Sequence, residues 1–268
     1  MNLPSSVIPF VKASACGNDF LLIHASNLKA GLDPIVLTRR LCDRHEGVGA
    51  DGVEWMHPHP SVDLEIHLIN SDGSIAEISG NGTRCVAAYV SATQQKDKII
   101  IHTGAGLKSC LLTGRNESEY EFEVEMGVAV IGNEKAIQLE SGEVSGIPVS
   151  MGNPHYVLIV ADFKGNWQSE AAEIQRSPHF SNGVNVEMVV IDGKHDIRAR
   201  FFERGAGETQ SSGTGSCASA LAALGTGKVQ SPVRVHTPGG TQTVRQKDGL
   251  VFLRGHARLV CQGEFFLT

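Results

Sequence analysis

The sequence has few aromatic residues, no long apolar run and no excess of positive charge. Phenylalanine, tryptophan and tyrosine make up 6% of its 268 residues, which disfavours a stacking platform for single-stranded nucleic acid. The formal net charge is −6, so neither nucleic acid nor an anionic membrane surface is the expected partner. No run of 18 apolar residues occurs, and residues 1–6 show no basic region followed by an apolar stretch. We therefore expect a cytoplasmic globular chain that binds a small molecule.

Metal-binding and common catalytic motifs are also missing. The cysteines lie at positions 16, 42, 85, 110, 217 and 261, without CxxC spacing, and are expected to be reduced thiols. His57 and His59 could contact a metal, but no third ligand lies nearby in sequence. The pair is interpreted as a loop, and no metal site is expected. The glycines at 104–109 do not fit a phosphate loop, the other glycine clusters do not fit a dinucleotide fingerprint, and no G-x-S-x-G elbow occurs.

Glycine is abundant, with 30 residues gathered into clusters beside asparagine, serine and threonine. Such clusters build backbone pockets, because glycine lets a ligand approach the main chain closely. They also recur: residues 79–82 match 212–215 at an offset of 133, 17–20 match 152–155 at 135, and 47–49 match 183–185 at 136. This order indicates a duplicated unit whose corresponding loops face one another across a pseudo-twofold axis.

Strand patterns predominate over helical ones. Alternating or β-rich runs predict strands at 10–12, 20–24, 64–70, 98–102, 120–125, 156–160, 185–191, 197–203 and 251–253. One helix is expected at 37–42. The small, apolar segments 83–90 and 216–224 follow the two Ser-Gly clusters and predict buried central helices wrapped by strands. The polar, turn-rich run 113–118 is interpreted as the connector between the halves.

The glycine clusters at these helix starts predict anion binding. A helix N-terminus presents unpaired N–H groups and the positive end of the helix dipole, so a carboxylate or phosphate is favoured there. For a single cluster the simpler interpretation is that Ser79 or Ser212 only caps its helix, which stabilises it by ~1 kcal/mol. Two such starts on a pseudo-twofold axis favour one shared anion, bound by the amides of Gly80, Asn81, Gly213 and Thr214.

His155 and Glu203 are further candidates, because each lies in a glycine-rich cluster of the second half. The alternative interpretation is a hydrogen-bonded turn histidine and an exposed glutamate.

Five runs of the sequence resemble the diaminopimelate epimerase family. They are GNDF at 17–20, NSDGSIAEISGNGTRC at 70–85, GNPH at 152–155, GVNVE at 183–187, and ERGAGET at 203–209 with SGTG at 212–215. The runs are in order and cover nearly the whole chain. The resemblance implies an α+β fold of two pseudo-symmetric domains, each a mostly antiparallel sheet or barrel around a central helix. We expect these domains at 1–117, completed by a strand at 262–268, and at 118–261.

The resemblance also implies the activity. Family members interconvert LL- and meso-2,6-diaminopimelate in lysine biosynthesis by proton transfer at the α-carbon, with no cofactor. A possible homodimer is expected. The reacting carboxylate would lie on the helix-start amides, and His155 and Glu203 would flank the proton-transfer groups. The residues expected to hold the substrate, chiefly at its distal end, are Asn18, Asn70, Asn153, Asn185, Glu203 and Arg204. Arg204 suits this role because its guanidinium can bind a carboxylate bidentately.

One departure affects the chemistry. The family's two proton-transferring residues are cysteines, and those positions are Ser79 and Ser212 in this sequence. A thiol has a pKa near ~8.5, which a helix N-terminus lowers further. An alcohol resembles water, nearer ~15, so forming the base costs ~8 kcal/mol more.

Three interpretations of the serines remain open. The chain is an epimerase with engineered serines, a natural branch that moves a double bond or eliminates water, or an amino-acid-binding protein without turnover. Cys16 could supply a thiol near the site, although a buried structural role is favoured. Cys85 and Cys217 are expected to face the core.

Overall fold

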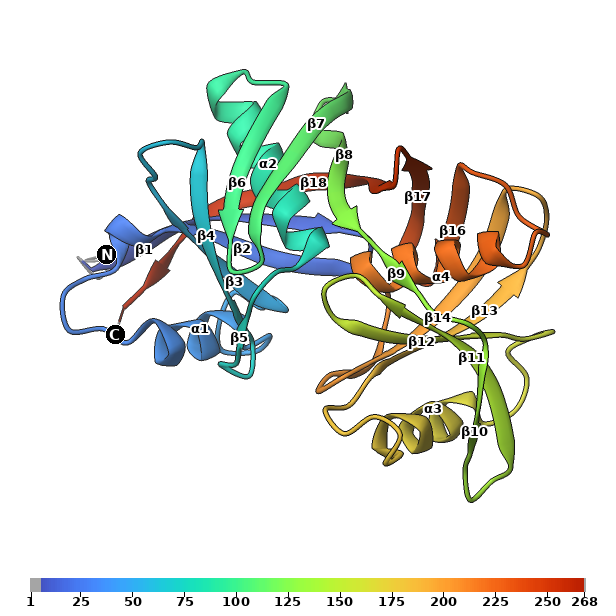
Figure 1. Cartoon of the computed structure of the whole chain (residues 1–268). Helices are drawn as coiled ribbons and strands as arrows, with labels where there is room; N and C mark the ends of the chain where they lie inside the picture. Colours follow the sequence, from blue (N-terminus) through green and yellow to red (C-terminus); the bar gives the residue numbers. More distant parts are fainter. Residues whose placement is uncertain (1–5, 268) are drawn as a thin grey trace. The chain divides into compact units, whose positions relative to one another are not determined.

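The computed structural model describes residues 6–267 and divides into two compact units. Unit 1 runs to Val124 and resumes at Gly255, whereas unit 2 is Glu125–Arg254. The chain therefore passes from one unit to the other within a strand each time, at 124–125 and at 254–255. Figure 1 traces these elements in chain order.

Unit 1 is a closed barrel of eight strands, each paired with the next and the last with the first. In barrel order they are β1 (Val7–Ala15), β2 (Asn18–His24), β3 (Gly52–His57), β4 (Leu64–Asn70), β6 (Lys98–Thr103), β7 (Gly106–Asn116), β8 (Glu119–Val128) and β18 (Leu250–Phe266). The β2–β3 and β4–β6 pairs are parallel. The β1–β2, β3–β4, β6–β7, β7–β8 and β18–β1 pairs are antiparallel. A short strand, β5 (Ile75–Ala76), pairs with β4.

Unit 2 repeats this order of pairings. Its strands are β9 (Val130–Ile131), β11 (Glu143–Ser150), β12 (Pro154–Ile159), β13 (Asn185–Ile191), β14 (Asp196–Glu203), β16 (Val233–Thr237), β17 (Gly240–Lys247) and the first residues of β18. The β12–β13 and β14–β16 pairs are parallel and the other registered pairs are antiparallel. Two short strands extend the unit, because β10 (Lys135–Gln138) pairs with β11 and β15 (Gly207–Thr209) pairs with β14.

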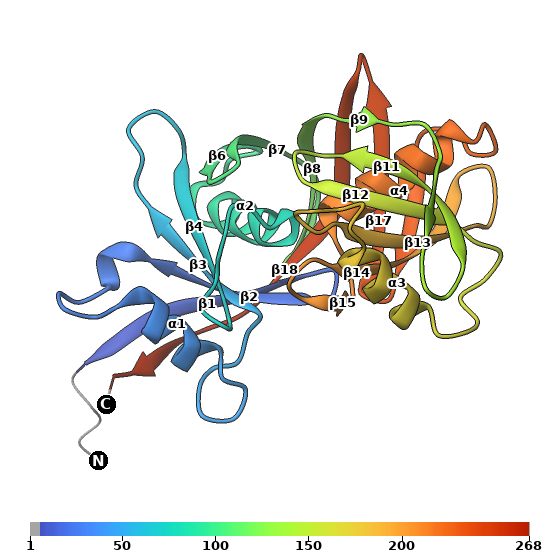
Figure 2. The same cartoon turned by 60° about the horizontal axis from the view of Figure 1, so that its bottom comes forward.

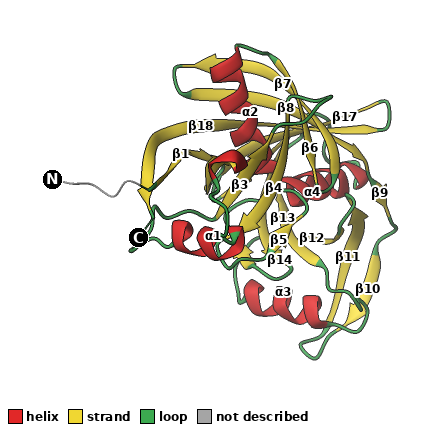
Figure 3. Cartoon of the chain, turned by 90° about the vertical axis from the view of Figure 1, so that its left-hand side faces the viewer, coloured by secondary structure: helices red, strands yellow, loops and turns green. Residues whose placement is uncertain are grey.

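Each unit wraps its strands around one helix. In unit 1 this helix is α2 (Gly80–Gln94), which contacts β1, β2, β6 and β7. In unit 2 it is α4 (Gly213–Gly225), which contacts β11 to β14, β16 and β17. Figure 2 shows α2 surrounded by strands, and Figure 3 shows how few helices accompany the strands. Small side chains such as alanine and serine let the strands approach both helices closely, which explains the nearly uncharged sequences.

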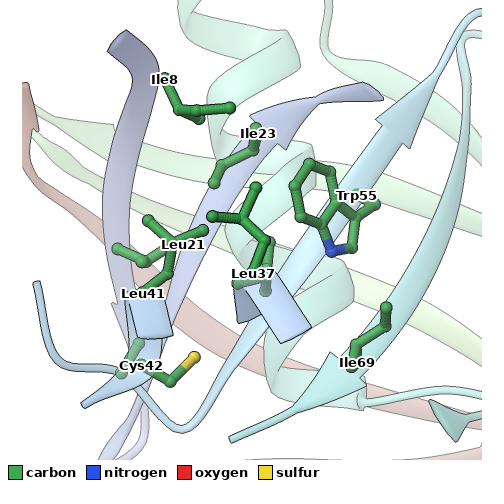
Figure 4. Close-up of a cluster of buried hydrophobic side chains, with 10 residues drawn as sticks. Ile8, Leu21, Ile23, Leu37, Leu41, Cys42, Trp55 and Ile69 are labelled. Atoms are coloured by element: carbon green, nitrogen blue, oxygen red, sulfur yellow. The ribbon is translucent and has the colours of Figure 1, made fainter. Parts of the chain in front are cut away.

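A second helix in each unit packs on the outer face of the strands. Helix α1 (Pro34–Cys42) contributes Leu37 and Leu41 to a buried cluster with Leu21 and Trp55 (Figure 4). Helix α3 (Trp167–Arg176) packs in the same way on β12 and β13. A 3-10 turn, η1 (Ala25–Asn27), follows β2. Because β3 and β13 are covered by helices on both faces, their buried side chains point alternately outward and toward the central helix.

The expected α+β class, mostly antiparallel with a central helix in each unit, is confirmed. The predicted strands and the three predicted helices all fall on observed elements, although β12 ends at Ile159 rather than at 160. The prediction of a connector at 113–118 was wrong, because residues 113–116 continue β7 and only residues 117–118 form the turn into β8. His57 is likewise the last residue of β3 and not a loop residue. Among the described residues, no helix is long and apolar enough to cross a membrane.

Candidate active site

The start of α2 is a serine-capped, glycine-rich turn. Ser79 has an extended backbone, and its Oγ accepts a hydrogen bond from the Gly82 N–H at 3.1 Å. The Thr83 hydroxyl donates to the Ser79 carbonyl at 2.8 Å, which closes the first turn. The side chain of Ser79 therefore caps the helix, as expected for the simpler role of this residue.

Asn18 and Asn81 belong to one hydrogen-bonded network in unit 1. The Asn81 amide donates to Asn18 Oδ1 at 2.6 Å, and Asn18 Nδ2 donates to Asp51 Oδ2 at 3.0 Å. Arg84, which is fully buried, donates through Nη2 to Asn81 Oδ1. This network fixes the β1–β2 turn against the first turn of α2. Asn70 is not part of it, because its Nδ2 donates to Ser74 Oγ at 2.9 Å.

The start of α4 has the same cap with one additional contact. Ser212 Oγ accepts from the Gly215 N–H at 3.1 Å and donates its own proton to Glu203 Oε2 at 3.0 Å. The other Glu203 oxygen accepts from the Thr209 hydroxyl at 2.6 Å. Each carboxyl oxygen of Glu203 thus accepts one hydroxyl hydrogen bond, from Thr209 and from Ser212. Ser212 and Glu203 thus form a hydroxyl–carboxylate pair at a helix N-terminus.

His155 connects α4 to a buried acid. Its Nε2 lies 3.0 Å from Asn153 Oδ1, and Asn153 Nδ2 donates to Thr214 Oγ1 at 3.3 Å. Its Nδ1 lies 2.6 Å from Glu187 Oε1, and both of these side chains are fully buried. Burial raises the pKa of Glu187, and His155 offsets part of this effect. His155 is therefore buried and hydrogen-bonded to a buried acid, and it is not part of an exposed turn.

Asn185 and Arg204 lie together at the ends of β13 and β14. Asn185 Nδ2 donates to the Pro154 carbonyl at 3.0 Å, and its Oδ1 accepts from the Arg204 N–H at 2.9 Å. The Arg204 side chain is exposed and donates through Nη1 to the Asn182 carbonyl at 2.7 Å. Hydrogen bonds thus connect the expected residues of unit 2 around the start of α4. These residues are 153, 155, 185, 203, 204, 212 and 214. Those of unit 1, at 18, 79, 80 and 81, surround the start of α2.

Sequence reasoning missed Glu54 and assigned no role to Glu187. Glu54 lies on β3, is fully buried, and neither of its carboxyl oxygens has a hydrogen-bond partner. Its Oε1 lies 1.9 Å from where a Cβ on Gly82 would stand, and Glu187 Oε1 lies 3.0 Å from the same point on Gly215. Burial alone raises the pKa of Glu54 to about 8. The sequence did contain a signal for these two acids. Glu54 and Glu187 are separated by 133 residues, which is the same offset that separates Ser79 from Ser212.

The cysteines provide no thiol at either cap. All six are free, and only Cys261 is exposed. Burial raises the pKa of Cys42 and of Cys110 to about 12 and that of Cys85 still further. Cys16 is buried in the β1–β2 turn and lies 3.7 Å from Arg84 Nη2. The core positions expected for Cys85 and Cys217 are confirmed.

A cavity of about 440 Å³ in unit 1 lies away from the cap residues and is lined by Phe10, His24, Tyr89 and Gln262, among others. None of the candidate residues lines it, so the cap of α2 remains the candidate site of this unit.

The caps suit chemistry that develops negative charge next to a carboxylate. The first N–H groups of a helix have no intrahelical partner, so a carboxylate at a cap is stabilised by fixed dipoles. Beside each cap stand a hydroxyl and a carboxyl group that could accept or return a proton.

The chain is similar in sequence to a family of epimerases. The sequence model of the diaminopimelate epimerase family matches residues 10–132 and 147–260. A diaminopimelate epimerase of Desulfitobacterium hafniense is 33% identical over 272 residues, covering 94% of this chain and 96% of the relative. One from Leptospira biflexa is 36% identical over 276 residues, covering 96% and 98%.

Solved structures share the fold at low identity. A hydroxyproline epimerase from Agrobacterium vitis superposes with a TM-score of 0.71 at 15% identity, covering 98% of this chain and 92% of the other. A methylitaconate-delta-isomerase has a TM-score of 0.67 at 15% identity, covering 97% and 95%. With matches over nearly its whole length, this chain belongs to the diaminopimelate epimerase family.

Proposed function

We propose that this protein is a cofactor-independent epimerase that inverts the α-carbon of diaminopimelate for lysine biosynthesis. The observation that carries the proposal is the cap itself, built twice. In each unit a serine caps a buried helix at a glycine-rich turn, with a buried glutamate against the third residue of the helix. The names of the relatives supply the reaction, and the caps supply groups that suit it.

The reacting carboxylate would be bound by the helix-start amides of Gly80, Asn81, Gly213 and Thr214. This requires that the helix-start amides of both units reach one ligand. When the α-proton leaves, the electron pair of the C–H bond spreads into the carboxylate. The amides and helix dipoles then stabilise the added charge without reorganising.

The distal end of the substrate would be bound by Asn18, Asn70, Asn153, Asn185 and Arg204. Arg204 is the cation in this set. Its exposed guanidinium has one carbonyl partner at 2.7 Å and retains further donors for a carboxylate. The asparagine amides provide both donors and acceptors, which suits an amino acid's ammonium and carboxylate groups.

Proton transfer in unit 2 would use the Ser212–Glu203 pair. An isolated serine is a poor base, but its hydroxyl proton here is already donated to Glu203. Ser212 Oγ would take the α-proton while its own proton passes to Glu203 Oε2, so the net acceptor is a carboxylate. Ser79 would return a proton on the opposite face of the α-carbon. Positioned acid and base groups of this kind contribute roughly 10²–10⁴-fold.

Deuterium incorporation tests the reaction. In deuterated water, the wild-type chain should label the α-carbon of LL-diaminopimelate and produce the meso isomer, as read by mass spectrometry. Glu203→Gln should reduce labelling by about 100-fold or more, because the amide cannot accept the serine proton. Tight binding without any labelling would replace this proposal with a binding protein.

Calorimetry tests the pocket. Arg204→Ala should weaken diaminopimelate binding by about 10-fold or more, since a charge-assisted hydrogen bond contributes ~1.5–3 kcal/mol. Arg176→Ala, which removes a cation from the last turn of α3, is the control and should leave the affinity unchanged. Equal affinity in the wild type and in Arg204→Ala would refute the assigned substrate contacts.

We also propose that the protein acts in the cytoplasm as a homodimer. Free cysteines throughout the chain support a reducing compartment. Apolar side chains exposed on β7, Leu107 at 62% and Leu111 at 47%, support pairing of two copies. Light scattering of the purified chain would test the dimer, and Leu107→Lys with Leu111→Lys should shift it to a monomer.

A further inference from the structure

Four histidines and a glutamate, none of them part of a cap, gather on three adjacent strands of unit 1. Strand β3 pairs with β4 and β4 pairs with β6, and these registers place His57 opposite Glu65 and Glu65 opposite His102. His59 follows β3 in the loop, and His67 lies two residues after Glu65 on the same face of β4. The sequence shows His57 and His59 without a third ligand nearby, because the other side chains come from neighbouring strands.

The alternation along the strands directs these side chains to the outer face of the barrel. Leu64 and Ile66, on either side of Glu65, are buried, and so is Ile101, which precedes His102. Glu65 and His102 therefore point away from the central helix. An ion from solution can reach them without opening the core of the unit.

Glu65 and His102 already lie at the separation of two zinc ligands. Glu65 Oε1 is 3.4 Å from His102 Nδ1. Ligand atoms at about 2.0–2.2 Å from a tetrahedral zinc ion lie about 3.3–3.6 Å from each other. The His102 Nδ1 atom is shielded from solvent and makes no hydrogen bond with the described residues. Buried nitrogen atoms without a partner are rare, and a bond to a metal ion would satisfy this one.

His59 supplies a third ligand from the loop between β3 and β4. The ligand atoms of His59, Glu65 and His102 all lie within 4.8 Å of one another, and the centroids of the His59 and His102 rings are 5.4 Å apart. His59 Nδ1 accepts a hydrogen bond from the Ser61 N–H at 3.2 Å. This bond must break before the neutral ring can bind a metal through either nitrogen. Because the contact is exposed, water can replace the lost partner, and rotation of the His59 ring closes the set at little cost.

His67 prepares Glu65 to act as a ligand. Its Nε2 lies 3.1 Å from Glu65 Oε1, within hydrogen-bond distance. This hydrogen bond from His67 holds the pKa of Glu65 below its ordinary value, although burial acts in the opposite direction. Glu65 is therefore a carboxylate at neutral pH. Hydrogen bonds of this kind orient the carboxylates that bind metals in proteins.

We propose that His59, Glu65 and His102 form a binding site for one divalent transition-metal ion, with Zn²⁺ as the best match. Two imidazoles and one carboxylate are ligands that zinc takes in proteins, whereas Mg²⁺ and Ca²⁺ prefer oxygen ligands. Water would fill the remaining position, since the His102 side chain is 40% exposed. The ion would join the loop after β3 to β4 and β6, so its expected role is to stabilise unit 1.

Calorimetry with ZnCl₂ on the untagged, chelator-treated protein tests the site. The wild type should bind one equivalent of zinc. Glu65→Gln and His102→Ala should each weaken the binding by about 100-fold or more, because loss of a hydrogen-bond partner of a metal ligand alone costs roughly 10–100-fold. No binding to the wild type, or equal zinc affinity in the wild type and His102→Ala, would overturn the proposal.

Two matched variants serve as controls. His236→Ala removes another histidine that contacts a carboxylate, since His236 Nε2 lies 2.9 Å from Asp196 Oδ1 in unit 2. Glu119→Gln is an exposed change of the same kind as Glu65→Gln, on β8. Both variants should keep the zinc affinity of the wild type. A loss in His236→Ala as large as that in His102→Ala would place the binding elsewhere and overturn the site.

Thermal unfolding provides a second measurement on the same proteins. An ion that binds only the folded chain raises the midpoint of unfolding. ZnCl₂ should raise the midpoint of the wild type but not that of Glu65→Gln, and MgCl₂ at the same concentration should raise neither. An equal rise with MgCl₂ would show a general ionic effect and contradict the site. Circular dichroism spectra recorded before each titration confirm that the variants are folded.

Cobalt reports the coordination of the ion itself. Co²⁺ accepts the same nitrogen and oxygen ligands as Zn²⁺, and a tetrahedral Co²⁺ complex absorbs visible light. CoCl₂ should produce a visible band that saturates at one equivalent in the wild type, disappears when ZnCl₂ is added, and is absent in His102→Ala. The same band in His102→Ala would overturn the assignment of the ligands. These measurements use no diaminopimelate, so their outcome is separate from that of the proposed function.

Discussion

The starts of α2 and α4 occupy equivalent places in two units of the same strand order, yet the buried acids beside them have different surroundings. Glu187 is paired with His155 at 2.6 Å, whereas Glu54 has no partner at all. Both carboxyl groups lie against a glycine of the cap. One substitution on the neighbouring strand, histidine against phenylalanine, separates the two environments. The position of the acid is thus common to both units, and its charge state is set locally.

This difference bears on the charge that each buried acid carries. In unit 1 burial raises the pKa of Glu54 and favours the neutral acid. In unit 2 burial also raises the pKa of Glu187, but the contact with His155 offsets part of that effect.

The largest effect is expected when the histidine beside the buried acid of unit 2 is replaced by the phenylalanine that unit 1 has at the matching position. His155→Phe would leave Glu187 buried without its partner, and we expect a loss of about 3–5 kcal/mol in unfolding free energy at pH 8. The raised pKa of Glu187 fixes the pH dependence: its neutral form is tolerated at low pH, so the loss should shrink as pH falls through that pKa. Urea unfolding at pH 8 and pH 5 measures this, and a loss of the same size at both would contradict the pairing.

The second prediction concerns the burial of Glu54. Its folded pKa of about 8 lies above the model-peptide value of 4.5. The folded state therefore holds the proton more tightly, and stability falls as pH rises between these values. Glu54→Gln, which mimics the neutral acid, should have nearly the stability of the wild type at pH 4.5 and should be more stable than the wild type at pH 9 by on the order of 5 kcal/mol. Glu119→Gln is the matched control, and parallel melting curves for wild type and Glu54→Gln across this range would contradict it.

The third prediction uses the two cap glycines. Gly82→Ala would place its Cβ 1.9 Å from Glu54 Oε1, whereas the nearest atoms to a Cβ on Gly215 lie at 2.9 Å. We expect overpacking to cost about 1–3 kcal/mol at position 82. Because the contact is with one side chain, Gly82→Ala and Glu54→Ala should be non-additive by about 1 kcal/mol or more. Strict additivity would show that Glu54 does not lie against the cap.

The smallest effect is expected from thiol reagents. Cys85 and Cys217 lie in corresponding helices and are both fully buried, so neither should react in the native protein. Iodoacetamide should label one cysteine, Cys261, and leave α-carbon exchange unchanged. Peptide mapping after labelling identifies the site. Inactivation that follows alkylation of Cys16 would restore a thiol to the mechanism.

The central helices and several strands could be predicted because their patterns are local. The apolar, small-residue segments of α2 and α4 follow their caps directly, and β4 and β13 match their predicted spans. The strand β7 was not predicted at all, and its last residues, 113–116, were interpreted as a connector because their polar side chains are typical of a turn. Helix α3 was missed since its mostly polar sequence has only a narrow buried stripe at Trp167, Ala171 and Ile174.

The contacts within the site were harder to predict from the sequence than the residues that form it. Motif resemblance identified Ser212 and Glu203, but their hydrogen bond depends on how β14, β15 and α4 pack. A single glutamate in an apolar strand gives no local signal, so Glu54 required the comparison of both halves. The partner of Glu187 lies on another strand, and no spacing within β13 predicts it.

The division of β18 between the units has a consequence for synthesis of the chain. Residues 255–266 close the barrel that begins with β1, whereas all strands and the central helix of 125–254 are made before them. The earlier-made residues of unit 1 therefore keep an open seam until the last segment of the chain has been made. Removing the last residues of that strand would leave the first-made part of the chain, the rest of unit 1, unable to finish folding.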